Sequence, residues 1–131
     1  MTQVLPASTG VIGVELDAKL IVNALPRLTA ELREDNFGNV ARAMMTTDLV
    51  PKQACGDVKL RRGRVRIAGM TKGSGMIQPR MATTLAFVLT DANIPVVLLR
   101  RMLRRAVERS YNRLSVDAVS YTHLDVYKRQ C

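Results

Sequence analysis

The residues with the clearest chemical potential lie in the segment Met70–Phe87, which reads MTKGSGMIQPRMATTLAF. In it, Thr83 directly follows the small residue Ala82 and comes shortly after a lysine-bearing glycine loop. If the Thr83 hydroxyl attacks the carbonyl of Ala82, the peptide bond between them breaks and Thr83 becomes a new N-terminus. Its α-amine, with a pKa of about 8, can then serve as the base for its own hydroxyl. The segment therefore predicts self-cleavage between Ala82 and Thr83 and a threonine nucleophile.

Three further short segments each allow two interpretations. In Ser8-Thr9-Gly10, a threonine before a glycine can present a hydroxyl and a backbone N–H at one point, as an oxyanion hole requires, or form an ordinary turn. In Lys72–Gly75, the lysine can hold an anion, but the motif lacks the Lys-Ser or Lys-Thr of a phosphate-binding P-loop and is also compatible with a plain turn. Thr46-Thr47-Asp48 can likewise be a helix terminus whose hydroxyls satisfy backbone groups.

Composition excludes several classes of protein. With 131 residues, 47% of them hydrophobic, the chain has the composition of a globular domain. No apolar run approaches the roughly 18 residues of a membrane span, and no signal-peptide layout begins the chain, so we predict a cytoplasmic location without a membrane partner. The only histidine, His123, lies near the end of the chain, and Cys55 is the only cysteine before Cys131. This scarcity argues against a metal site and against triads built on histidine, and Cys55 is predicted to be a semi-buried structural residue.

The closing segment Val119–Gln130, VSYTHLDVYKRQ, resembles the translation of two back-to-back transposon ends used in sequencing libraries. Its codons, with the last two bases of an Ala118 codon, can form a DNA stretch that is its own reverse complement. A folded protein has no reason to obey that constraint. We therefore expect residues 118–131 to be a non-native scar and exclude them from fold reasoning.

The formal net charge of +9 arises largely from two basic clusters. Around Arg62-Gly63, apolar and basic residues alternate, which predicts a two-stranded hairpin with one solvated face. Between Leu99 and Val107, apolar residues recur at helical spacing and leave arginines on the opposite face. The clusters comprise Lys59, Arg61, Arg62, Arg64 and Arg66, and Arg100, Arg101, Arg104, Arg105 and Arg109. A small basic nucleic-acid-binding domain is the alternative function, but no stacking aromatics or reading motif accompany the clusters, so we predict no nucleic-acid partner.

The periodicity of the remaining segments predicts an α/β protein with mixed sheets flanked by helices. Asp17 is predicted to cap a helix that runs to about Leu32, in which Pro26 produces either a kink or two short turns. The other expected elements are a helix from Asn36 to about Thr46-Thr47-Asp48, a strand at 84–89, an arginine-rich helix capped by Asp91 or Asn93, and a strand that begins at 113–116.

Taken together, six blocks in order carry a resemblance to a known family. The blocks are STGVIG, MTTD followed by PK, KGSGMI, P-x-MAT, LAFVLTDA and SYNRLSVD. They resemble the bifunctional ornithine acetyltransferase/N-acetylglutamate synthase family of arginine biosynthesis, over nearly all of Val4 to Asp117. The resemblance implies a layered αββα-type sandwich, present here as a fragment. It also implies that residues 1–82 are the end of an α chain and residues 83–117 the start of a β chain, which stay together after cleavage in an α2β2 heterotetramer.

The resemblance also implies a role for each matching residue. Thr83 is the nucleophile, Thr9 and Gly10 form the oxyanion hole, and Thr46 and Lys72 line the substrate pocket with Thr83. Acetyl then passes from N-acetylornithine to Thr83 and on to glutamate, with no cofactor required, and Lys72 is expected to pair with an amino-acid carboxylate. Family members that make acetylglutamate directly use acetyl-coenzyme A as the donor. Thr84 departs from the methionine that the family often has there, and the fragment itself is expected to be inactive.

Overall fold

The computed structural model describes residues 7–11, 13–78 and 84–116. These residues fall into two units, which divide between Phe37 and Gly38. No helix within the described ranges is long and apolar enough to cross a membrane.

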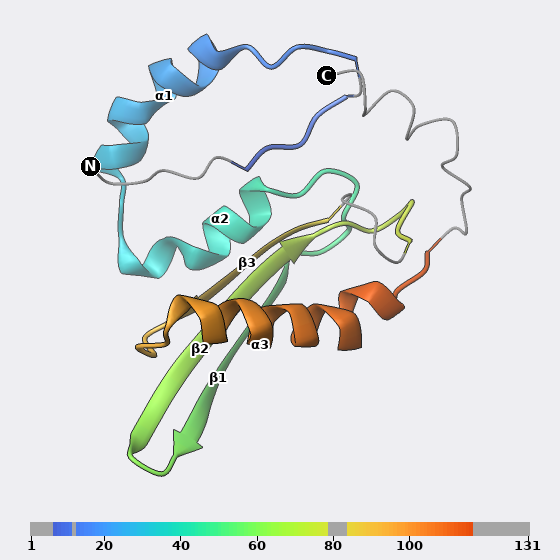
Figure 1. Ribbon diagram of the computed structural model, residues 1–131. Coiled ribbons are helices and arrows are strands. Elements are labelled where there is room, and N and C mark those ends of the chain that lie inside the picture. The colour runs from blue at the N-terminus through green and yellow to red at the C-terminus, as the bar shows by residue number, and fades with distance from the viewer. Residues whose placement is uncertain (1–6, 12, 79–83, 117–131) are drawn as a thin grey trace. The chain divides into compact units, whose positions relative to one another are not determined.

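The first unit contains one helix, α1, from Ala18 to Ala30 (Figure 1). The predicted cap is confirmed, because the Asp17 carboxylate accepts a hydrogen bond of 2.9 Å from the backbone N–H of Lys19. Pro26 lies inside this single helix, so the two-turn alternative is wrong. Ahead of α1, the N–H of Val14 donates to the carbonyl of Val11 at 3.2 Å, with Gly13 at a positive φ of 81°. The small-residue segment therefore forms a tight turn there.

A short helix, α2 from Phe37 to Ala43, follows a 3₁₀ turn at Glu34–Asn36. The sequence predicted a helix from Asn36 to about Thr46-Thr47-Asp48, and this end is wrong. The helix stops at Ala43, and two of the three polar residues, Thr47 and Asp48, bond to a segment far along the chain instead of to the helix. Ala41 is the buried residue of α2.

The second unit is built on a three-stranded antiparallel sheet in the order β1-β2-β3 (Figure 1). The strands are β1 (Lys52–Leu60), β2 (Gly63–Lys72) and β3 (Leu85–Thr90). The predicted hairpin is confirmed, since Leu60 pairs with Gly63 around a loop of two residues. The predicted strand at 84–89 is confirmed as β3. The α/β class is confirmed as well, although the strands described here pair only in the antiparallel sense, so this sheet is not mixed.

The arginine-rich helix is confirmed as α3, from Val96 to Arg109, but its predicted cap is wrong. Pro95 occupies the N-cap position with an extended ψ of 135°, and no side chain caps this helix. Proline disfavours the helical conformation for the residue before it, so the helix cannot begin nearer Asn93. Asp91 instead accepts a hydrogen bond of 2.8 Å from the backbone N–H of Arg66 on β2.

The strand expected at 113–116 is reduced to a single bridge. A 3₁₀ turn occupies Tyr111–Arg113, and Val116 then pairs with Ile77 through backbone hydrogen bonds of 3.1 and 2.8 Å. The bridge connects the end of the described chain to the segment that follows β2. This pairing is antiparallel, like that of the sheet.

Few side chains are buried in the described ranges, and half of those are polar. Ala41 and Met70 are the buried apolar residues, and Asp48 and Lys72 are the buried charged ones. Many large apolar side chains of α1, α3 and the sheet are exposed. Cys55 on β1 is also exposed, so the semi-buried position predicted for it is wrong. Because buried charges are costly unless they are paired and hydrogen-bonded, the surroundings of Asp48 and Lys72 indicate a functional site.

Candidate active site

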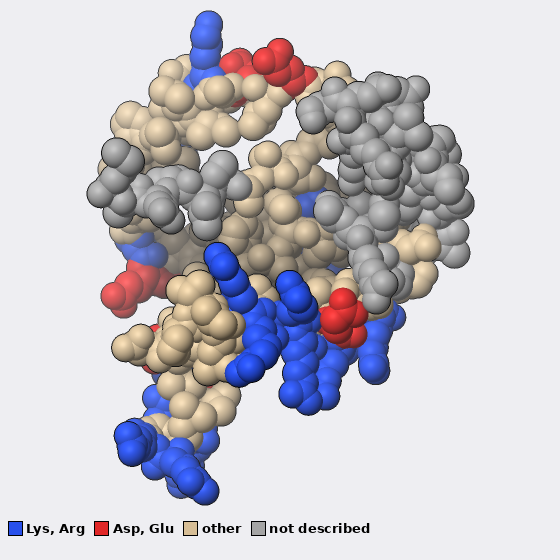
Figure 2. Space-filling view, in the orientation of Figure 1, with Lys and Arg blue, Asp and Glu red and all other residues tan. Residues whose placement is uncertain are grey.

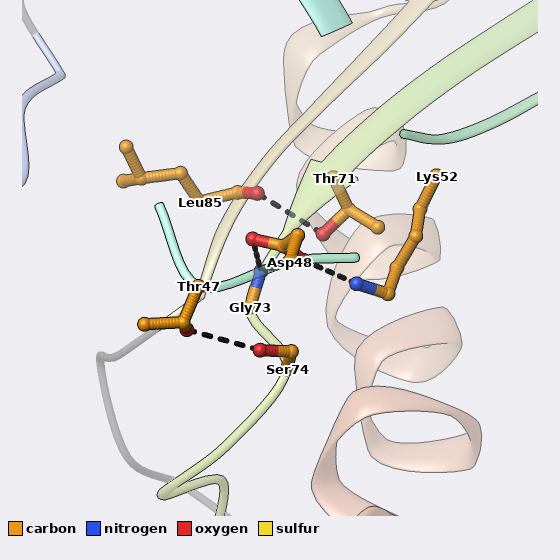
Figure 3. A network of polar contacts seen from close by, with 7 residues as sticks. All are labelled: Thr47, Asp48, Lys52, Thr71, Gly73, Ser74 and Leu85. Atoms are coloured by element: carbon orange, nitrogen blue, oxygen red, sulfur yellow. Dashed lines mark hydrogen bonds and ion pairs between the residues drawn. The ribbon is translucent and has the colours of Figure 1, made fainter. Parts of the chain in front are cut away.

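Asp48 lies at the centre of a polar network that joins two loops (Figure 3). Its side chain is only 1% exposed. The backbone N–H of Gly73 donates to both carboxylate oxygens, at 2.9 and 3.2 Å, and the Lys52 ammonium donates to one of them. A buried carboxylate with these donors is both charge-compensated and fixed in direction.

Hydrogen bonding outweighs burial in setting the protonation of this carboxyl group. Burial alone raises the pKa of Asp48, because it penalises the charged form. The hydrogen bond from Lys52 and the backbone hydrogen bonds from Gly73 and Thr46 act in the other direction, and together they hold the pKa below its usual value. Asp48 is therefore a carboxylate at neutral pH, in contact with Thr46 on one side and with the residue after Lys72 on the other.

Two threonine hydroxyls add further connections around this network (Figure 3). The hydroxyls of Thr47 and Ser74 lie 3.0 Å apart, which ties the same two loops together a second time. The Thr71 hydroxyl donates to the carbonyl of Leu85 at 3.0 Å and so connects β2 to the start of β3. The interpretation of Thr46-Thr47-Asp48 as a helix terminus is therefore wrong, because Thr47 and Asp48 bond to residues far along the chain.

Lys72 is the last residue of β2 and is only 5% exposed. It pairs across the sheet with Leu85, the first residue of β3. The predicted glycine loop thus begins one residue later, at Gly73, and the lysine itself is held by the strand. A lysine placed in a strand and shielded from water is a strong partner for a carboxylate.

Gly73 shows why this loop requires glycine. Its φ is +133°, a conformation that side chains disfavour. A Cβ built on it would also lie 3.1 Å from the Thr84 hydroxyl and 3.6 Å from Ile77. The loop therefore passes close against Thr84, the residue that follows Thr83 in the chain.

The structure describes the positions of most predicted site residues, but not of all of them. The segments that carry Thr46 and Lys72 are brought together through Asp48, and the loop after Lys72 passes close to Thr84. Ala82 and Thr83 lie outside the described residues. Thr9 and Gly10 are exposed and belong to the first unit, so their role as an oxyanion hole stays a prediction.

Sequence reasoning missed Asp48, Lys52 and Ser74 as members of the site. The available signal was weak, since an aspartate after two threonines is common at helix ends. The decisive partner, Gly73, lies 25 residues further along the chain.

The two basic clusters of the second unit, on the hairpin and on α3, lie apart from this network. Figure 2 shows lysine and arginine gathered over α3 and the tip of the β1–β2 hairpin. In the hairpin, Asp57 pairs with Arg64 at 3.6 Å and with Arg66 at 3.2 Å. These exposed ion pairs are typical of a solvated face.

A hollow of about 360 Å³ lies beside the sheet but has a different character. Its lining is mainly apolar and includes Met70, Phe87, Val88 and Tyr111. Lys52 and Thr71 of the polar network also line it, whereas the predicted substrate residues Thr46 and Lys72 do not.

Comparison with known proteins gives a consistent result over almost the whole chain. The ArgJ family model matches residues 1–125. Similar proteins include the arginine biosynthesis bifunctional protein ArgJ of Thermosynechococcus vestitus, 48% identical over 92% of this chain and 29% of the relative. The protein of the same name from Gluconobacter oxydans is 47% identical over 88% of this chain and 27% of its own length. The ArgJ protein from Methylococcus capsulatus is 47% identical over 92% of this chain and 30% of its own length. The chain thus spans about 30% of the length of these relatives.

Proposed function

Because the chain belongs to the ArgJ family, we propose that its residues form part of an acetyltransferase that moves an acetyl group from N-acetylornithine to glutamate through a threonine ester. The observation that carries this proposal is the junction at Asp48. There the Thr46-Thr47 loop meets the loop after Lys72, and the latter passes close to Thr84. Thr84 follows the expected nucleophile in the chain, so residues expected to bind substrate lie in segments that come close to its neighbour in sequence.

The proposed reaction begins with self-cleavage. The Thr83 hydroxyl attacks the carbonyl carbon of Ala82, the C–N bond breaks, and an ester links the two residues. Water then hydrolyses the ester, which leaves a carboxylate on Ala82 and a free α-amine and hydroxyl on Thr83. That amine is the base that the nucleophile needs, so no histidine is required.

Acetyl transfer then proceeds in two half-reactions. The Thr83 hydroxyl attacks the acetyl carbonyl of N-acetylornithine while its α-amine takes the proton, and Thr9 with Gly10 stabilises the oxyanion. The amide C–N bond breaks, and ornithine leaves with that proton. The amine of glutamate attacks the acetyl-threonine ester, N-acetylglutamate leaves, and the Thr83 hydroxyl recovers its proton. Thr46 and Lys72 hold the substrate, with Lys72 on a carboxylate.

The sheet supports the proposal that the two chains stay associated after cleavage. β2 lies before the cleaved bond and β3 after it, and the two strands pair over six residues, from Ile67↔Thr90 to Lys72↔Leu85. Cleavage would therefore leave this part of the sheet continuous across two chains. The α2β2 heterotetramer, the cytoplasmic location and the lack of nucleic-acid or membrane partners stay predictions. Acetyl-coenzyme A is the proposed alternative donor.

Mass spectrometry of the protein expressed from its complete gene tests the proposal. We expect two chains, the second beginning at Thr83, and acetyl transfer from N-acetylornithine to glutamate. Thr83→Ala should give one uncut chain without transfer. Thr90→Ala, a threonine control at the far end of β3, should cleave normally. A new N-terminus at Thr84, or no cleavage, would contradict the assignment.

A further inference from the structure

We infer that Asp48 is a positioning residue for both self-cleavage and acetyl transfer, an inference that rests on the proposed function. Its carboxylate holds the loop after Lys72 against the Thr46-Thr47 loop and against Thr84. Asp48 itself touches neither substrate nor the scissile bond in this proposal. It acts through the backbone of Gly73.

The arrangement of donors around Asp48 supports a positioning role. The Gly73 amide, the Thr46 backbone and the Lys52 ammonium reach one carboxylate from two segments of the chain, residues 46–52 and the loop after Lys72. The amide donation spans both oxygens, at 2.9 and 3.2 Å, so it restrains the orientation of the Gly73 peptide as well as its distance. Two of the three donors are backbone groups, which directly fixes the course of both loops.

The conformation of Gly73 explains why this restraint is needed. A residue at a φ of +133° keeps that conformation only when its surroundings hold it. On one side Gly73 lies close to the Thr84 side chain, and on the other its N–H faces Asp48. The hydrogen bond to the carboxylate thus restrains the loop at a point close to Thr84, the residue after the expected nucleophile. Without it, the Gly73 N–H would lack its acceptor and the loop could rotate away.

Lys52 neutralises the carboxylate but contributes less to position. Its side chain is 39% exposed. Lys52 is the first residue of β1 and lies only four residues after Asp48 in the sequence, so its contact does not join distant segments. Removing Lys52 would leave the Gly73 and Thr46 hydrogen bonds in place. Its loss should therefore have a smaller effect on the reaction than the loss of the carboxylate.

The test uses the protein expressed from its complete gene, with Asp48→Asn as the main variant. An amide of the same shape keeps one acceptor oxygen but loses the charge and the second acceptor. We expect self-cleavage and kcat to fall about tenfold or more, as for a lost hydrogen bond to a charged group at a reacting site. Asp48→Glu, which restores the charge, should recover part of the rate, and Lys52→Met should lose less than Asp48→Asn.

Three controls separate positioning from simple loss of stability. Asp57→Asn removes an exposed carboxylate that pairs with arginines of the hairpin, and should leave both rates unchanged. The fraction of folded protein is measured by circular dichroism for every variant, and rates are expressed per folded molecule. Thr47→Val removes the hydrogen bond to Ser74, which is the second link between the same loops, and should also slow cleavage. This variant provides the test if Asp48→Asn does not fold.

Hydrogen exchange at the Gly73 amide completes the experiment, because it does not depend on activity. We expect faster exchange in Asp48→Asn than in the unaltered protein or in Asp57→Asn. Unaltered protein that does not cleave before Thr83 would overturn the proposed function. Normal cleavage in the unaltered protein, together with per-molecule rates in Asp48→Asn and Thr47→Val equal to it, would overturn the positioning role alone.

Discussion

Lys72 and Leu85 face each other across β2 and β3, as the last residue of one strand and the first residue of the next. The bond expected to break, between Ala82 and Thr83, therefore lies in the connection between two paired strands. Cleavage there removes a covalent link without removing any of the strand pairing between β2 and β3. The two product chains are therefore expected to stay associated for as long as β2 and β3 stay paired.

The first prediction is that the two chains co-purify and separate only on unfolding. Thr71→Val removes the hydroxyl that donates to the Leu85 carbonyl, and should lower the free energy of separation by about 1 kcal/mol. Native mass spectrometry in increasing urea measures the separation, with Thr29→Val as the control, because the Thr29 hydroxyl bonds within α1. Chains that separate on ordinary gel filtration would contradict the prediction.

The second prediction concerns Gly73. In Gly73→Ala, the methyl group meets Thr84 and the residue must keep a φ of +133°, so we expect a loss of stability of about 1–3 kcal/mol and slower self-cleavage. Gly56→Ala is the control, because it lies in β1 with nothing within 4 Å of the added carbon. Thermal melts and the time course of cleavage provide the measurements. Equal effects of the two substitutions would show that the close approach to Thr84 is unimportant.

The third prediction is a pH dependence that follows from the lowered pKa of Asp48. In the unfolded chain an aspartate titrates near 3.9, so below this value the unfolded state takes up a proton that the folded state resists. The stabilisation by the carboxylate is thus fully present above about pH 4 and is lost as the pH falls through the lower folded pKa.

Thermal midpoints of the unaltered protein and of Asp48→Asn, measured across pH, test whether the stabilisation by Asp48 is lost in acid. Their difference should be constant from about pH 5 to 8 and should shrink on acidification below about 4. A difference that grows in acid would mean that burial dominates the titration of Asp48.

The fourth prediction assigns the charge of Lys72 to substrate binding. Lys72→Met keeps an apolar chain of similar length in a position that is 5% exposed but removes the ammonium. We expect the KM for glutamate to rise about tenfold or more, because a charge-assisted hydrogen bond to a carboxylate is lost. Lys59→Met, an exposed lysine of β1, is the control. An unchanged KM would show that Lys72 does not contact the carboxylate.

The fifth prediction distinguishes the alternative function. Despite the basic surface over α3 and the hairpin, we expect no binding to duplex or single-stranded DNA at physiological salt. Part of that charge is already paired, since Asp57 contacts both Arg64 and Arg66. Fluorescence anisotropy at several salt concentrations measures this, because phosphate contacts give a steep salt dependence. Micromolar binding at 150 mM salt would support the alternative.

Local patterns were sufficient to predict much of the second unit. The alternation of apolar and basic residues predicted the hairpin, and the helical spacing from Leu99 to Val107 predicted α3. Asp17 was recognised as a cap because its partner, the Lys19 amide, is two residues away. In each case the interaction that shapes the element lies within a few residues in the sequence.

The errors share the opposite property. The end of α2 was misjudged because Asp48 and Thr47 bond to Gly73 and Ser74, 25 and 27 residues further along. The cap of α3 was misjudged because Asp91 bonds to Arg66 on β2. A short polar side chain can hydrogen-bond to the backbone at a helix end or to a distant backbone amide. Only the folded chain shows which of these partners is within reach.

The sequence by itself thus determined the family and the α/β class, because residue types and their order specify these, and it predicted which residues carry the chemistry for acyl transfer. Only the tertiary structure decided that the Thr46 segment and the loop after Lys72 meet at a buried carboxylate beside Thr84. The physical reason is that a buried charge is stable only where several donors converge on it. That convergence depends on how β2 and β3 pair and on the course of the loops between elements, which no local pattern encodes.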